Sequence, residues 1–195
     1  MRRVGAIILA AGGSGRFGQP KQLLPFQGES LLRRAVRNAI EASCGVVTVV
    51  AGDVRARIET ELREMPAVIV ENPGWQRGLG TSIRCGLLHQ RSLRPEPDAV
   101  ILLACDQPFV DASVIKSLMA EWENSGKPMV ACGYAGTLGI PALFDRSCFD
   151  ELLSLPDDSG AKALLQSRHA DVAQIEFERG AIDVDTPADF ADLTS

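Results

Sequence analysis

Two kinds of segment alternate along this chain. Short, almost continuous apolar runs are followed by longer segments in which apolar residues recur every three or four positions, as on one face of a helix. The clearest runs are Val4–Ala10 and Asp98–Ala104, and such continuity is typical of strands buried on both faces. The alternation predicts an α/β fold of three layers, in which helices cover both faces of a mostly parallel, twisted sheet.

The weaker segments complete the predicted order of elements. Further strands are expected at Val46–Ala51, Ala67–Val70, Pro128–Cys132, Ile140–Phe144 and Ala181–Val184. Helices are expected at Ser30–Ala42, Gly52–Glu64, Thr81–Gln90 and Asp111–Asn124, as two short helices around Leu155–Leu165, and from Thr186-Pro187 onward. Gly133–Gly139 is interpreted as a glycine-rich turn and Leu93–Pro97 as a loop instead of a linker, because neither half alone has a complete sheet. We therefore expect one domain over residues 1–195.

Composition and charge exclude several classes of protein. The chain has 195 residues, of which 46% are hydrophobic, enough for one continuous core. The formal net charge of −5 argues against general binding to nucleic acid or to an anionic membrane. No apolar run approaches the roughly 18 residues of a membrane span, and the apolar stretch at the start of the chain is interpreted as a strand, not a signal peptide. A cytoplasmic protein with small-molecule substrates is expected.

The five cysteines favour neither a disulfide framework nor a zinc site. Their number is odd and no two are spaced as C-x-x-C. We expect them to be reduced and packed as small apolar residues. Cys105 is singled out because Asp106 follows it directly.

The glycine-rich stretch after the first strand raises two familiar interpretations. Gly13–Gly18 satisfies the G-x-G-x-x-G pattern of dinucleotide-binding proteins. In those proteins a helix begins within the glycines, but Pro20 and Pro25 would lie inside that helix and break it. The acidic residue expected about twenty positions later is also missing. A P-loop needs lysine after its last glycine, where this chain has Gln19.

An extended, cationic loop remains as the interpretation of this stretch. Glycines let backbone N–H groups approach phosphate oxygens closely. Arg16 and Lys21 add charge that can stabilise a departing phosphate group. These features favour an anion-binding loop over a loop with two solvated cations.

Asp106 is a candidate metal ligand. It directly follows the most apolar predicted strand, and ligands of open α/β sheets bind beyond the carboxyl ends of the strands. Mg²⁺ prefers such carboxylate oxygens and commonly completes its shell with phosphates and water. The alternative is that Asp106 only caps the Gln107-Pro108 turn.

A second glycine-rich segment begins a predicted helix. Gly78, Gly80, Thr81 and Ser82 would offer N–H groups and hydroxyls to a base edge or a sugar. The ordinary alternative is a well-capped helix with its apolar face on the core, and both can hold because they use different residues.

The loop LAAGGSGRFGQPKQLLPFQGESLL (Leu9–Leu32) resembles the signature loop of the MobA-like nucleotidyltransferases, and within them the molybdenum cofactor cytidylyltransferases. The resemblance extends to five further stretches: NPGWQRGLGTSIRCGL (Asn72–Leu87), VILLACDQPFVD (Val100–Asp111), GIPALF (Gly139–Phe144), LPDDSGAKALL (Leu155–Leu165) and IDVDTPADF (Ile182–Phe190). Several ordered motifs at compatible spacings are more specific than one glycine pattern.

This resemblance implies a Rossmann-like nucleotidyltransferase fold and a set of site residues. Lys21, Arg16 and Asp106 would be catalytic, and Asp185 would join Asp106 as a Mg²⁺ ligand unless Asp183 or Asp185 merely caps the last helix. The residues that would bind the nucleotide are Leu9, Ala10, Ala11, Gly12, Gly13, Gly15, Lys21, Asn72, Gly78, Gly80, Thr81 and Ser82.

The implied reaction is nucleotidyl transfer from CTP to the terminal phosphate of molybdenum-loaded molybdopterin. Pyrophosphate would leave, and the product would be the cytosine dinucleotide cofactor, delivered through transient contact with a molybdenum hydroxylase. Ile140 and Lys162 stand where relatives often have histidine and arginine. The alternatives are transfer of a cytidylyl or guanylyl group to another phosphorylated acceptor, and a non-catalytic accessory protein.

Other charged residues have ordinary interpretations beside these. Arg84 and Lys162 could contact a phosphate or be exposed helix charges, and His89 and His169 lie outside every motif. No serine–histidine or cysteine–histidine motif supports nucleophilic catalysis by a side chain.

Overall fold

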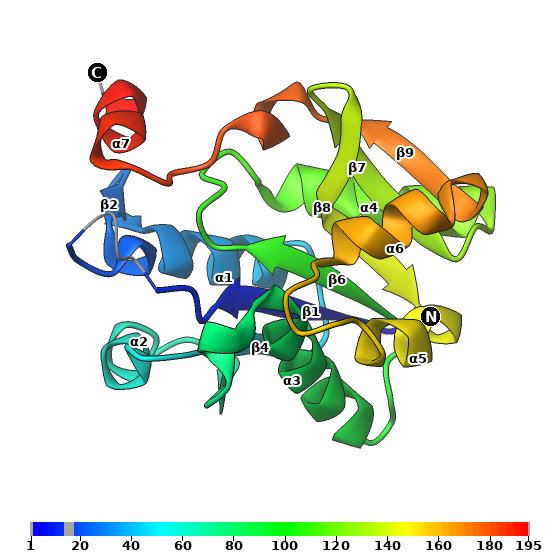
Figure 1. Cartoon of the computed structure of the whole chain (residues 1–195), viewed down its shortest axis with the longest axis horizontal. Helices are drawn as coiled ribbons and strands as arrows, with labels where there is room; N and C mark the ends of the chain where they lie inside the picture. Colours follow the sequence, from blue (N-terminus) through cyan, green and yellow to red (C-terminus); the bar gives the residue numbers. More distant parts are fainter. Residues whose placement is uncertain (1, 14–17, 195) are drawn as a thin grey trace.

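The computed structural model describes residues 2–13 and 18–194, and it confirms the predicted α/β class (Figure 1). A mixed sheet of seven strands has the order β5-β4-β1-β6-β8-β7-β9. Its strands are β1 (Val4–Ala10), β4 (Val47–Ala51), β5 (Ala67–Glu71), β6 (Ala99–Ala104), β7 (Met129–Tyr134), β8 (Thr137–Asp145) and β9 (Val172–Glu176). Every pairing is parallel except the two made by β8.

Helices cover both faces of the sheet, as the alternating pattern predicts. One face carries α1 (Leu31–Glu41), α2 (Arg55–Glu61) and α4 (Ala112–Ser125), whose apolar sides share a core cluster with the sheet. The other face carries α3 (Leu79–Ser92), α5 (Phe149–Leu153) and α6 (Ala161–Ser167). The continuous apolar run of β1 is explained by this sandwich, because all its residues are buried.

A smaller cluster lies at one end of the molecule. There α7 (Pro187–Thr194) lies beside a hairpin made by β2 (Pro25–Phe26) and β3 (Glu29–Ser30) (Figure 1). Buried Phe26 and Val184 share this cluster with Phe190 of α7. This packing brings the last part of the chain back to the segment that follows β1.

Two predicted helix starts are confirmed by their caps. The Ser30 hydroxyl accepts a hydrogen bond from the Arg33 N–H at 3.0 Å. Asp111 accepts from the N–H groups of Ser113 and Val114 at 2.9 and 3.0 Å. Each cap satisfies N–H groups that have no partner within the helix.

The predicted turn at Gly133–Gly139 is wrong, because most of it is strand. β7 and β8 are joined through Ala135 and Gly136 alone, both with positive φ, as a tight hairpin requires. Gly133 and Gly139 instead permit close packing: an added Cβ would lie 2.2 Å from Gln174 Nε2 and 2.1 Å from Tyr134 Oη. These two glycines serve packing, not chain reversal.

The predicted strand at Ala181–Val184 is also wrong. A short 3₁₀ helix, Glu178–Ala181, precedes an irregular segment. The Val184 N–H donates to the Asp106 carbonyl oxygen at 3.0 Å, but residues 181–184 join no sheet. The strand β9 at the sheet edge, by contrast, was not expected from the sequence, since three of its five positions are not buried.

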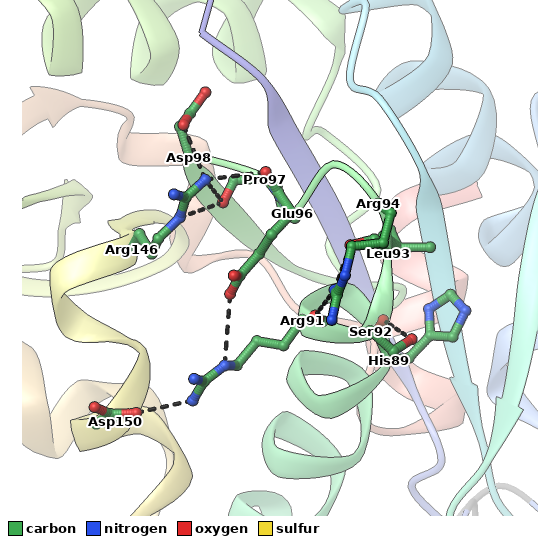
Figure 2. A network of polar contacts seen from close by, with 10 residues as sticks. All are labelled: His89, Arg91, Ser92, Leu93, Arg94, Glu96, Pro97, Asp98, Arg146 and Asp150. Atoms are coloured by element: carbon green, nitrogen blue, oxygen red, sulfur yellow. Dashed lines mark hydrogen bonds and ion pairs between the residues drawn. The ribbon is translucent and has the colours of Figure 1, made fainter.

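The loop after α3 is held to its surroundings by hydrogen bonds and ion pairs (Figure 2). Arg146 donates to the carbonyl oxygens of Glu96 and Pro97 at 2.9–3.0 Å and pairs with the Asp98 carboxylate at 2.9 Å. Arg91 of α3 pairs with Asp150 of α5 at 2.8 Å. These contacts join α3 and α5 to the loop that leads into β6, at the amino-terminal end of that strand.

Two further expectations concern cysteines and membranes. All five cysteines are free, and Cys44, Cys105, Cys132 and Cys148 are buried, as predicted. Across residues 2–13 and 18–194, no helix combines the length and apolarity needed to cross a bilayer.

Candidate active site

A cleft of about 270 Å³ opens at the carboxyl ends of β1 and β6. These strands are parallel neighbours with Leu9 opposite Ala104, so the loops that follow them emerge side by side. The lining comprises Leu9, Ala10, Ala11, Gly12, Lys21, Gln22, Leu79, Ser82, Ala104, Cys105, Asp106, Gln107, Tyr134, Ile140 and Asp183. The cleft thus contains residues from both motifs that the sequence singled out, the glycine loop and the aspartate after β6.

Three predicted site residues lie together, and two of them, Lys21 and Asp106, line this cleft. The Lys21 ammonium lies 2.6 Å from Asp106 Oδ2 and 2.7 Å from Asp185 Oδ1. The side chains of Lys21 and Asp106 keep only 17% and 20% of their full exposure, whereas Asp185 keeps 55%. One cation therefore joins two carboxylates that lie far apart in the sequence.

Lys21 is positioned by the residue that follows it. Lys21–Leu23 forms one turn of 3₁₀ helix. Within that turn the buried Gln22 amide donates to the carbonyl oxygens of Ala10 and Gly12 at 2.9 and 2.8 Å. These bonds fix the 3₁₀ turn to the end of β1. Sequence reasoning missed Gln22, although a glutamine between a lysine and two leucines was a signal for a buried polar anchor.

The charge of Lys21 is stabilised by its two partners. Burial alone would lower the pKa of the ammonium, but Asp106 and Asp185 outweigh it and raise that pKa above its ordinary value. Lys21 is consequently protonated throughout the physiological range.

Asp185 does not cap the last helix. The carboxylate of Asp189 accepts from the N–H groups of Asp185 and Thr186 at 3.0 and 2.7 Å. The Thr186 hydroxyl accepts from the Asp189 N–H at 3.2 Å. This reciprocal cap satisfies the helix start, and the Asp185 side chain points to Lys21 instead.

Asp183 is a third carboxylate at the cleft, and sequence reasoning considered it only as a cap. Partial burial of this carboxyl, together with the negative charges of Asp106 and Asp185, raises its pKa to about 6. Asp183 and Asp106 both line the cleft, so negative charge is concentrated on this side of it.

The second glycine-rich segment forms a buried polar network. Asn72 Nδ2 donates to Thr81 Oγ1 at 2.8 Å and to Ser82 Oγ at 3.0 Å. Thr81 in turn donates to the Gly78 carbonyl oxygen at 2.7 Å. Of these residues Ser82 lines the cleft, so the network fixes Ser82 while Thr81 closes the start of α3.

Gly78 and Gly80 lie against another part of the chain. An added Cβ would lie 2.4 Å from the Asp157 carbonyl oxygen at Gly78 and 2.1 Å from the Pro156 carbonyl oxygen at Gly80. Arg84 holds the same segment, since it donates to the carbonyl oxygens of Leu153 and Leu155 and pairs with Asp157. Neither interpretation offered for Arg84, a phosphate contact or an exposed charge, describes this position.

Leu9, Ala10, Ala11 and Gly12, which were predicted to bind the nucleotide, line the cleft, whereas other residues singled out from the sequence lie around it or away from it. Gly13 lies against Trp75, whose ring would be 2.8 Å from an added Cβ. Lys162 lines a small adjoining cavity of about 130 Å³. His89 Nδ1 lies 3.0 Å from the Thr48 hydroxyl, away from the cleft residues. Gly15 and Arg16 fall outside the described residues.

The donor set fits a hard divalent cation. Two carboxylate oxygens, one from Asp106 and one from Asp185, converge on a single positive charge, at present the Lys21 ammonium. Oxygen ligands of this kind suit Mg²⁺ and Mn²⁺. The part of the chain that the structure describes holds no group of three or more His, Cys, Asp or Glu arranged for a metal ion.

Comparison with known proteins agrees with this geometry. The family model described as the MobA-like NTP transferase domain matches residues 6–172. The molybdenum cofactor cytidylyltransferase of Escherichia coli (strain K12) is 25% identical over 191 residues, which cover 97% of this chain and 95% of the relative. The purine catabolism protein PucB of Bacillus subtilis (strain 168) is 26% identical over 195 residues, 94% of this chain and 92% of the relative.

A solved structure extends the similarity to three dimensions. The protein Rv0371c of Mycobacterium tuberculosis superposes with a TM-score of 0.85 at 27% identity, over 98% of this chain and 97% of that chain. Rv0371c has also been solved in complex with manganese, with a TM-score of 0.81 at 25% identity over the same shares of the two chains.

Proposed function

The chain belongs to the MobA-like NTP transferase family, and on this basis we propose that it transfers a cytidylyl group from CTP to the terminal phosphate of molybdenum-loaded molybdopterin. The products would be pyrophosphate and molybdopterin cytosine dinucleotide. Membership of this family identifies the chain as a nucleotidyltransferase. The choice of nucleotide and acceptor is the proposal.

The observation that supports this proposal best is the convergence of Lys21, Asp106 and Asp185 beside the glycine loop. A nucleoside triphosphate needs neutralised phosphates and an acceptor held in line with the bond that breaks. The cleft offers Lys21 and Asp106 beside the end of β1, and Asp185 lies in contact with the same lysine.

The reaction needs no basic side chain. An oxygen of the acceptor phosphate, already an anion at neutral pH, would form a bond to the α-phosphorus of CTP. The bond from that phosphorus to the bridging oxygen of the β-phosphate would break, and pyrophosphate would leave with the electron pair. Lys21 would neutralise charge on the phosphates as it grows, which is the commonest large contribution to such rates.

Asp106 and Asp185 would hold Mg²⁺. When bound, the ion supplies Lewis-acid stabilisation of phosphate oxygens. The Gln22 amide would keep Lys21 in place, since it donates to the carbonyl oxygens of Ala10 and Gly12 at the end of β1. Ser82, fixed by Asn72, would offer its hydroxyl to the nucleotide.

The preference for CTP is supported by similarity in sequence. LAAG at Leu9–Gly12 and GLGTS at Gly78–Ser82 match the cytidine-using branch, and the Escherichia coli relative is named a cytidylyltransferase. A transient partner of the molybdenum hydroxylase class would receive the product. Five free cysteines suit a reducing compartment such as the cytoplasm.

The test is incubation of the protein with Mg²⁺, molybdenum-loaded molybdopterin and either CTP or GTP. We expect pyrophosphate release with CTP, and a dinucleotide of the expected mass in the product. If CTP yields pyrophosphate only when a different phosphorylated compound is supplied, that compound is the acceptor and molybdopterin is not. If pyrophosphate is released with GTP and not with CTP, the nucleotide substrate is GTP.

An accessory protein without catalysis is the second candidate. One relative, PucB, is named for purine catabolism and not for nucleotidyl transfer, and this name is the observation that favours the second candidate. That candidate predicts binding of the pterin cofactor with no metal-dependent release of pyrophosphate, so the same assay separates the two.

A further inference from the structure

The position of the Lys21 ammonium has a consequence for how a metal ion reaches this site. Its nitrogen lies within hydrogen-bond distance of both Asp106 Oδ2 and Asp185 Oδ1, at 2.6 and 2.7 Å. These are the two oxygens that would bind a divalent cation. The ammonium therefore stands where that cation would be.

The two cations exclude one another. Mg²⁺ binds carboxylate oxygens at about 2.0–2.1 Å and keeps a compact shell of ligands. A divalent ion held by both carboxylates would need the space between them, and the repulsion between it and a lysine in contact with the same oxygens would be severe at this short range. Either Lys21 or the metal can bridge Asp106 and Asp185.

The surroundings explain why a cation is stable between these two carboxylates. Asp183 lines the same cleft as Lys21 and Asp106, so a third carboxylate adds negative charge to it. Without a bridging cation, Asp106 and Asp185 would repel each other. The final segment of the chain, which carries Asp183 and Asp185, is joined to the Asp106 loop by the bond from the Val184 N–H, and the lysine reinforces that junction.

A nucleoside triphosphate changes the balance. Its phosphates offer Lys21 several new acceptor oxygens, and they bring a metal ion already bound. The lysine can then leave the two carboxylates without losing its partners, and the carboxylates exchange one cation for another.

We propose that Lys21 is the resident counter-ion of the metal site: it bridges Asp106 and Asp185 in the nucleotide-free protein, keeps a divalent ion out, and releases the carboxylates only when the metal arrives with the triphosphate. This inference rests on the proposed function, because it needs a nucleotide that accepts the lysine. It gives Lys21 a second task beside neutralising phosphate, namely setting the order in which metal and nucleotide bind.

The test measures Mn²⁺ binding to the protein without nucleotide, from the electron paramagnetic resonance signal of unbound Mn²⁺. Lys21→Met keeps the apolar stem and removes the charge, so we expect it to bind Mn²⁺ roughly tenfold or more tightly than the wild type. Lys21→Arg keeps the charge and should stay close to the wild type. Lys116→Met removes an exposed charge on α4 and serves as the matched control, with no gain. Adding Asp106→Asn to Lys21→Met should abolish the gain.

The order of binding has its own readout. Wild-type protein should bind Mn²⁺ together with CTP at Mn²⁺ concentrations at which the nucleotide-free protein binds none. Equal affinity of Lys21→Met and wild type, or an equal gain in Lys116→Met, would overturn the inference, provided that circular dichroism shows all variants folded. Pyrophosphate release by the wild type is measured in parallel. If the wild type releases pyrophosphate but Lys21→Met binds Mn²⁺ no more tightly, only the counter-ion role of Lys21 is refuted. If Lys21→Met binds Mn²⁺ more tightly but the wild type releases no pyrophosphate, the proposed function is refuted and the exclusion of metal by Lys21 stands.

Discussion

The Asp189 carboxylate accepts the backbone N–H of Asp185 at 3.0 Å, and this contact fixes the backbone from which the Asp185 side chain reaches Lys21. A helix cap and a candidate metal ligand are thus parts of one short segment. The start of α7 has a structural task at the site, although the helix itself lies at the periphery of the fold.

We expect Asp189→Ala to loosen the start of α7 and to weaken metal binding, because Asp185 and Thr186 both lose the acceptor of their N–H groups. Amide hydrogen exchange should become faster over residues 185–190, and the affinity for Mn²⁺ with CTP should fall by less than in Asp185→Asn. Glu123→Ala, which removes an exposed carboxylate from α4, should change neither. Unchanged exchange in Asp189→Ala would show that the cap is not needed.

The second prediction concerns turnover. Lys21→Ala should lower the rate of pyrophosphate release by roughly a hundredfold or more, since the loss of one preorganised stabilising group commonly costs about 2.7–4 kcal/mol in the barrier. Lys116→Ala, on the exposed side of α4, should retain the full rate. Steady-state kinetics with saturating CTP and Mg²⁺ make the comparison. A Lys21→Ala protein with nearly full turnover would remove this lysine from the mechanism.

The predictable parts of the site are those that follow from chain direction and strand order. Asp106 lies at the end of a strand buried on both faces, and the carboxyl ends of parallel strands share one edge of the sheet. The cleft could therefore be placed from β1 and β6 alone. The similarity of the IDVDTPADF segment to the family pointed to Asp185, which lies beside Lys21 in the structure.

The missed parts depend on contacts between distant segments. Gly133 and Gly139 suggest a turn when only local sequence is considered, yet each lies against another side chain, and Gly78 and Gly80, predicted at a helix start, lie against the backbone of residues 156–157. Arg84 is charged and helical, and only the position of the 153–157 segment explains why it is partly buried. The strand β9 lies at the edge of the sheet, where an apolar pattern is not required.

The third prediction concerns pH. The pKa of Asp183 is raised to about 6 from an ordinary value of 3.8, so the folded protein binds this proton more tightly than the unfolded chain does. The stabilisation is fully present below the unfolded pKa and is lost as the pH rises through about 6. We expect the melting temperature of the wild type, relative to Asp183→Asn, to fall between pH 4 and pH 7 in the absence of metal. Asp150→Asn, far from the cleft, should follow the wild type, and parallel curves for wild type and Asp183→Asn would contradict the assignment.

The fourth prediction separates folding from binding with two glycines. At Gly80 an added methyl group would lie 2.1 Å from the Pro156 carbonyl oxygen and 3.0 Å from that of Ser159. Both are backbone atoms and can move only if the whole 156–159 segment shifts. Gly80→Ala should therefore lower the free energy of unfolding by about 1–3 kcal/mol, the usual cost of overpacking.

Gly12 differs because nothing lies within 4 Å of an added Cβ and its φ is not positive. Gly12→Ala should leave the free energy of unfolding almost unchanged. Gly12 lines the cleft, however, so the new methyl group would occupy space where we expect backbone N–H groups to approach a phosphate. We expect the KM for CTP to rise roughly tenfold, a loss of about 1.4 kcal/mol in binding, with urea unfolding and initial-rate kinetics as the two measurements. If Gly12→Ala bound CTP as the wild type does, the glycine loop would not be the phosphate-binding element, and the nucleotide would have to bind elsewhere along the cleft.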